Sequence, residues 1–178
     1  TYPVLKSLTA ETVSPLANKV ANLVTTKMNP AKLTTAIESG VNALLSIPDE
    51  KLDKFTANVK ESYEGVSGDS CNSIPLPIDA INSLTPPATS SLDAAKLEQV
   101  TKKFASTAQA IPSTSSSGIC LPSSKEGLEK LWIGQTELVI GIPKASKQEL
   151  VAKAGAAVKS IPNPDLLRVL PDMKKVLK

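Results

Sequence analysis

The sequence predicts an all-α protein, an irregular bundle of about seven to eight short helices in a single domain over residues 1–178. Apolar residues recur at three- and four-residue steps in most segments, as on the buried face of a helix. Clean strand alternation is scarce. Proline cannot continue a helix and keeps the preceding residue out of the helical region. It follows isoleucine five times: Ile47-Pro48, Ile74-Pro75, Ile111-Pro112, Ile142-Pro143 and Ile161-Pro162.

Each of these isoleucines is expected to be the last buried residue of a helix or turn. The first helix is expected to begin near Ser14-Pro15, because proline is tolerated in a first turn. Asn29-Pro30 repeats this arrangement, and a third helix starts at Asp49 and stops at Gly65. The apolar faces of these helices are Val13, Leu16, Val20 and Leu23; Leu33, Ile37, Val41, Leu44 and Leu45; and Leu52, Phe55, Val59 and Tyr63.

The middle of the chain is expected to hold two loops and one long helix. A first loop spans residues 65–77, and a short helical turn over residues 78–84 ends before Pro86-Pro87. Ser90 or Ser91 then caps a helix that ends at Ile111. A second loop spans residues 112–122. The apolar face of the long helix is Leu97, Val100, Phe104 and Ala108.

Three helix starts are predicted in the last third of the chain. Ser123 and Ser146 each precede a glutamate by three residues, which is a capping box, and Asn163 precedes a proline. The expected faces are Leu128, Leu131, Trp132 and Leu138; Leu150, Val151, Ala154, Ala157, Val158 and Ile161; and Leu166, Leu170, Met173 and Leu177.

Two features of the 123–142 segment leave alternatives open. Residues 137–142 resemble a strand, but no partner strand is evident, so they are expected to end a buried helix. Gly134 and Gly141 lie two turns apart, and they either let another helix approach closely or occur there by chance.

The two cysteines predict one disulfide. Cys71 and Cys120 both fall in the serine-rich loops, whereas free cysteines usually lie in cores. A disulfide between these loops indicates an oxidising compartment, and we expect a secreted protein. The chain opens at Thr1 rather than Met, as after removal of a signal peptide. The alternative is two free thiols in a cytosolic protein.

Composition argues against most catalytic and nucleic-acid functions. The chain has no histidine, the commonest general base and triad partner. Two cysteines alone do not make a zinc site, and no glycine-rich phosphate loop is present. Arg168 is the only arginine and aromatic residues are few, so nucleic-acid binding is not expected. We therefore expect no enzyme, no cofactor and no metal.

A large aliphatic core with few aromatic rings favours a carrier for a small hydrophobic ligand such as a fatty acid, a sterol or a pigment. The apolar run over residues 131–142 is too short and too polar to span a bilayer. The alternative is a secreted surface-active, cell-wall or effector-type interaction protein without an internal ligand. The aromatic residues of the site also fit a simple core role. The predicted ligand-binding residues are Trp132, Phe104, Leu128, Leu131, Phe55, Ile37, Val41 and Val100.

Overall fold

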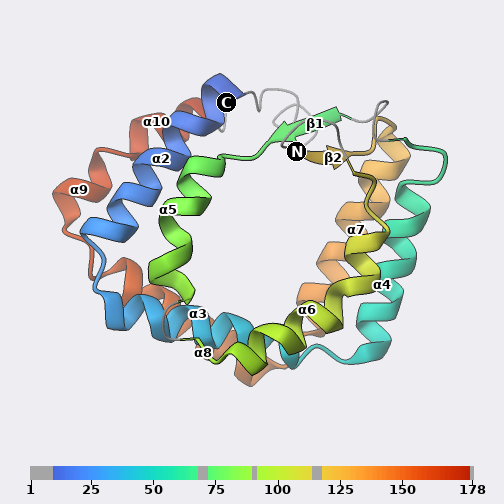
Figure 1. Cartoon of the computed structure of the whole chain (residues 1–178), viewed down its shortest axis with the longest axis horizontal. Helices are drawn as coiled ribbons and strands as arrows, with labels where there is room; N and C mark the ends of the chain where they lie inside the picture. Colours follow the sequence, from blue (N-terminus) through green and yellow to red (C-terminus); the bar gives the residue numbers. More distant parts are fainter. Residues whose placement is uncertain (1–9, 68–71, 90–91, 114–117, 177–178) are drawn as a thin grey trace. The chain divides into compact units, whose positions relative to one another are not determined.

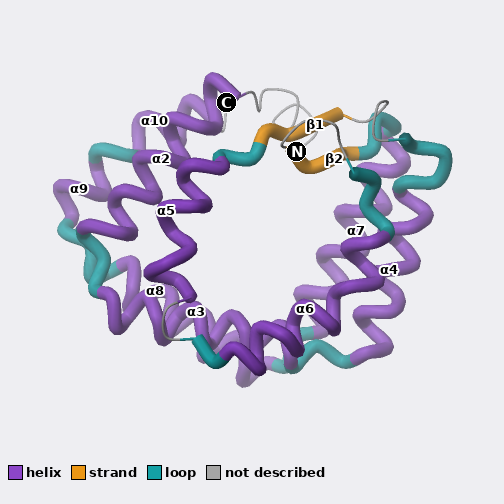
Figure 2. Tube along the Cα trace, in the orientation of Figure 1, coloured by secondary structure: helices purple, strands orange, loops and turns teal. Residues whose placement is uncertain are grey.

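The computed structural model describes residues 10–67, 72–89, 92–113 and 118–176, which are mostly helical (Figures 1 and 2). This confirms the helical bundle. Two compact units are present: Thr1–Glu38, Ile74–Leu92 and Val151–Lys178 form unit 1, and Ser39–Ser73 and Asp93–Leu150 form unit 2. The expectation of one domain stays a prediction.

The elements are α2 (Ala10–Thr26), α3 (Pro30–Leu45), α4 (Asp49–Ser62), β1 (Asn72–Pro75), α5 (Ile78–Thr89), α6 (Ala94–Gln109), β2 (Gly118–Leu121), α7 (Lys125–Gly141), α8 (Lys144–Val158), α9 (Asn163–Leu167) and α10 (Leu170–Val176).

In unit 1, α2 packs against both α5 and α10 (Figure 1). Ala21 of α2 and Ala80 of α5 are both buried, and their small side chains let helix backbones approach closely. An ion pair joins Lys19 of α2 to Asp172 of α10. The backbone N–H of Asn29 donates to Ser160 Oγ at 2.9 Å, which ties the chain after α2 to the segment after α8.

In unit 2, α4 is the central helix and packs against α6 and α7. Its apolar face contributes to two small core clusters that contain the predicted face residues. One cluster is Ile47, Leu52 and Leu138, with Phe55, Phe104 and Ile142 packed against it. The other is Val59, Tyr63 and Cys120, with Phe55, Val66, Ala110 and Leu131 around it.

Glycines line the side of α7 that faces α4. Gly127, Gly134 and Gly141 lie seven residues apart and therefore share a helix face. A Cβ added at Gly134 or at Gly141 would come within 3.0 Å of Asn58 or Lys51 of α4, respectively. The close approach considered from the sequence is thus confirmed. The face of α7 that carries these glycines packs against α4. Trp132 lies on a different side of the helix and is 61% exposed. The expectation that Trp132 belongs to the core is therefore wrong.

Two buried hydroxyl groups, one on α4 and one on the residue that follows it, are satisfied by neighbouring elements. The Oγ1 atoms of Thr56 and of Thr107 on α6 lie 2.6 Å apart. The Tyr63 hydroxyl donates to the carbonyl oxygen of Cys120 at 2.6 Å. Burial raises the pKa of the Tyr63 phenol above its ordinary value, so the group keeps its proton and stays a donor.

The predicted loops over residues 65–77 and 112–122 contain the two strands, which pair as a two-stranded sheet. This corrects the expectation of loops alone, since strands of four residues are too short to show an alternation pattern. Ile74-Pro75 accordingly lies in β1 and does not end a helix. Cys120 lies in β2 and is 1% exposed, so its polar-loop placement is also wrong. Cys71 lies outside the described residues, among which no cysteine is free, and the disulfide stays a prediction.

Three prolines stand inside helices where the sequence predicted boundaries. Helix α2 begins at Ala10, so that Pro15 lies in its second turn rather than its first. Helix α5 continues through Pro86 and Pro87 to Thr89. Each of these prolines removes one backbone N–H donor without ending its helix.

The starts of α3, α4, α5 and α9 agree with the prediction, whereas other helix starts differ by a few residues. Asp93 caps α6 by accepting from the N–H of Ala95 at 2.9 Å, whereas Ser90 and Ser91 lie outside the described residues. Ser124, one residue after the predicted cap, caps α7. Helix α8 begins at Lys144, directly after a proline, and not at Ser146. The last predicted helix is divided into α9 and α10, and Leu177 lies outside the described residues.

Candidate functional site

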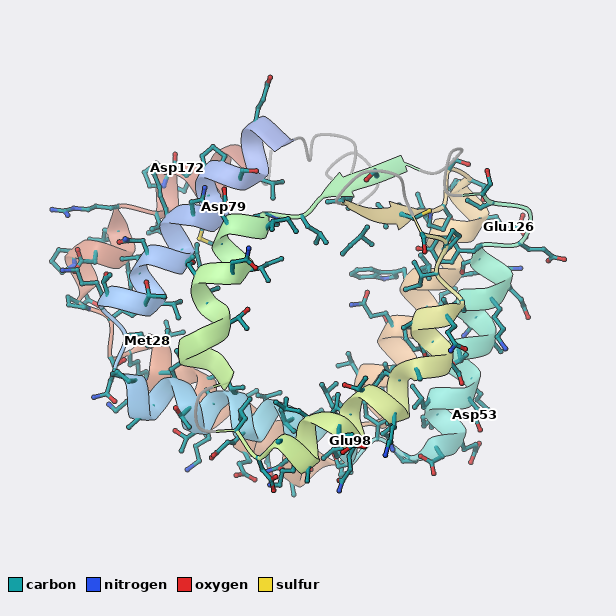
Figure 3. All side chains as sticks on the ribbon, in the orientation of Figure 1. Met28, Asp53, Asp79, Glu98, Glu126 and Asp172 are labelled. Atoms are coloured by element: carbon teal, nitrogen blue, oxygen red, sulfur yellow. The ribbon has the colours of Figure 1, made fainter. Side chains whose placement is uncertain are left out.

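Unit 1 contains an apolar pocket of about 600 Å³. It is formed by α2, the last residue of α8, α9 and α10, and Figure 3 labels Met28, a lining residue that follows α2. Asn163 is the one polar residue of its lining. The two principal walls are Val20, Leu23 and Val24 from α2, and Leu166, Leu170 and Met173 from α9 and α10.

Helical periodicity places these side chains on common faces. Val20, Leu23 and Val24 follow the i, i+3, i+4 spacing, while Leu166, Leu170 and Met173 continue one apolar row from α9 into α10. Val20 is 39% exposed and Met173 is 41% exposed, so the walls retain apolar surface that the fold does not cover. Such a pocket offers hydrocarbon contact and almost no hydrogen bonding.

A second pocket, of about 550 Å³, adjoins the apolar pocket. The two pockets share Leu23 and Val169, but the remaining lining of the second is polar. These polar residues are Asn18, Lys19, Asn22, Lys27, Asp165 and Arg168.

Two of the three cations in this second pocket have acidic neighbours. Lys19 pairs with Asp172, which is labelled in Figure 3, and Arg168 Nη1 lies 3.6 Å from Asp165 Oδ1. Lys27 is exposed and has no acidic partner among the described residues. The pocket therefore presents one uncompensated positive charge.

A third pocket, of about 330 Å³, lies in unit 2 between the end of α4 and the start of α7. Glu61, Glu64 and Glu126 line it, and Lys130 Nζ lies 3.2 Å from Glu61 Oε2. The part of the chain that the structure describes has no group of three residues arranged to hold a metal ion. We assign no ligand to this pocket.

The structure does not gather the eight predicted ligand-binding residues around the apolar pocket. Ile37 belongs to unit 1, and the other seven belong to unit 2. Phe55 and Phe104 pack against the unit 2 core, and none of the eight lines the 600 Å³ pocket. Their role in ligand binding stays a prediction. The unit 2 residues are Val41, Phe55, Val100, Phe104, Leu128, Leu131 and Trp132.

Several of the pocket residues are predicted by the sequence, but as core residues rather than as the lining of a pocket. Val20, Leu23, Leu166, Leu170 and Met173 were all expected on apolar helix faces. Periodicity shows which face is apolar, whereas coverage of that face depends on contacts between segments far apart in the chain. The apolar periodicity of these residues is therefore the same whether the face lines a pocket or packs in a core.

No described helix combines the length and the apolar character that a membrane span requires. Comparison of the chain with protein-family models, with curated proteins and with solved structures gave no match.

Proposed function

We propose that this protein is a secreted, non-enzymatic carrier that binds a small hydrophobic ligand, such as a fatty acid, a sterol or a pigment. The observation that carries the proposal is the apolar pocket of unit 1. Its volume of about 600 Å³ falls within the range of about 300–1,000 Å³ that is typical of small-molecule sites.

The chemistry of the lining supports a hydrocarbon ligand over a polar one. A polar ligand would lose hydrogen bonds to water in this pocket and regain few, because Asn163 is the only polar lining residue. A hydrocarbon loses none, and each methylene removed from water contributes about 0.8 kcal/mol. Affinity is then expected to rise roughly fourfold per methylene until the pocket is filled.

We expect Val20→Trp to weaken ligand binding at least about tenfold, since a larger side chain in the wall competes with the ligand for space. Val20 is partly exposed, so the change does not enlarge a residue of the packed core. Titration with a fluorescent fatty acid measures the effect. Val151→Trp is the matched control, because Val151 lies in unit 1, is 71% exposed and does not line the pocket.

Native mass spectrometry of the purified protein provides an independent test. A co-purifying lipid-sized adduct, released by organic extraction, supports the carrier. The proposal is wrong if nothing is released and if fluorescent fatty acids, sterols and polyenes all fail to bind the unmodified protein.

We further propose that Cys71 and Cys120 form a disulfide, in keeping with secretion. Cys120 lies in β2 and is almost fully buried, so the link would hold the strand to the chain before β1. Thiol titration of the unfolded, unreduced protein is expected to find no free thiol, and reduction is expected to release two. Two free thiols before reduction would contradict both the disulfide and the inferred compartment.

The alternative is a surface-active or interaction protein without an internal ligand. The observation that favours it is the outer face of α7, where Trp132, Ile133, Val139 and Ile140 are all more than half exposed. Exposed apolar patches mark surfaces that bind interfaces or partners. A surface-pressure measurement distinguishes this reading, since a protein indifferent to an air–water interface is not surface-active.

A further inference from the structure

We infer that the ligand is a single-chain amphiphile with an anionic head group, whose hydrocarbon tail lies in the apolar pocket and whose head lies at Lys27. This inference rests on the proposed carrier function and narrows its ligand class. The geometry that points to it is that the two unit 1 pockets share two lining residues, Leu23 and Val169.

The helical register of α2 places Leu23 beside the lysines of the polar pocket. Lys19, Leu23 and Lys27 lie four residues apart, so their side chains form one row along the helix. The N–H of Lys27 donates to the carbonyl of Leu23 at 2.9 Å, which extends the helical turn past the end of α2. A tail against Leu23 therefore has a cation one turn away on the same row.

Charge in the polar pocket favours an anion. Asp172 and Asp165 pair with Lys19 and Arg168, and Lys27 is left as the uncompensated charge. Asn18 and Asn22 add side-chain amides that are able to donate hydrogen bonds to a carboxylate or a phosphate. A cationic head group would instead be repelled by the uncompensated charge of Lys27.

Binding of palmitate, hexadecanol and hexadecylammonium to the full chain tests the inference, because the three ligands share one tail. We expect palmitate to bind roughly threefold to fivefold more tightly than hexadecanol, the effect of one partly exposed charge pair. High salt is expected to reduce this preference. Lys27→Gln should remove most of this preference, because the palmitate carboxylate loses its uncompensated cation. The matched control is Lys153→Gln, since Lys153 is exposed on α8 in unit 1 and lines neither pocket.

The outcomes separate the two proposals. Equal binding of palmitate and hexadecanol by the unmodified protein overturns the anionic head group. A palmitate preference that survives in Lys27→Gln overturns the placement of the head at Lys27. Either result leaves the carrier standing. Failure of all three ligands to bind overturns the carrier itself. Hexadecyl phosphate is expected to bind like palmitate. Displacement of palmitate by inorganic phosphate as effectively as by hexadecyl phosphate would indicate a plain anion site and would also overturn the inference.

Discussion

Ile47→Ala is expected to lower the free energy of unfolding by about 2–5 kcal/mol, the range for removing a large aliphatic side chain from a core. Ile47 is 2% exposed and packs with Leu52 and Leu138. Phe55, Phe104 and Ile142 surround this cluster, so the cavity left by alanine has few ways to collapse. Urea unfolding followed by circular dichroism measures the loss.

Ile111→Ala is the matched control, because Ile111 also precedes a proline and belongs to unit 2 but is 36% exposed. Its loss is expected to be about 1 kcal/mol or less. Both substitutions remove the β-branch before a proline, so backbone effects largely cancel in the comparison. Ile47→Val is expected to cost about 0.5–1.5 kcal/mol. Equal losses of unfolding free energy for Ile47→Ala and Ile111→Ala would contradict this prediction, because they would show that burial of the isoleucine does not determine its contribution to stability.

Gly127→Ala is expected to lower the free energy of unfolding by about 1–3 kcal/mol, although alanine is the better helix former by about 1 kcal/mol. A Cβ at this position would lie 2.8 Å from Pro122 Cβ, 2.8 Å from the carbonyl oxygen of Ser62 and 2.9 Å from Ser124 Oγ. A backbone carbonyl and a proline ring cannot swing aside as a long side chain can. The first turn of α7 must then move away from α4.

Gly155→Ala provides a control of opposite sign. A Cβ at Gly155 in α8 meets nothing within 4 Å, so only the helix preference of alanine counts. Thermal unfolding is expected to show Gly155→Ala stabilised by about 0.5–1 kcal/mol. Destabilisation by the Gly155 variant, or a neutral Gly127 variant, would contradict the steric explanation.

The helical bundle was predictable because its signals are local. The bounds of α3 and α4 follow from prolines next to regular apolar faces, and Pro30 and Pro48 stand where the helices begin. The same rule gave wrong ends where prolines fall inside a helix terminus, as Pro86 does in α5. A proline weakens a helix by a finite amount, and packing of α5 against α2 outweighs it.

The features that the sequence did not predict depend on contacts between distant segments. Trp132 belongs to a helix that is apolar on several sides, and composition does not show that the glycine side would be buried. The apolar pocket has the same origin, because α2 and α10 each carry an ordinary amphipathic face. Only their packing determines that a space of about 600 Å³ remains between those faces.

The hydrogen bond between Thr56 and Thr107 has a consequence for the uniqueness of the unit 2 core. Aliphatic side chains pack against one another without directional bonds. One helix can therefore shift by a turn against another at a modest cost in free energy. A buried hydroxyl tolerates no such slip, since it would lose its partner in a medium that offers no water. The hydrogen bond between the two threonines thus favours one alignment of α4 with α6 over alignments shifted by a turn.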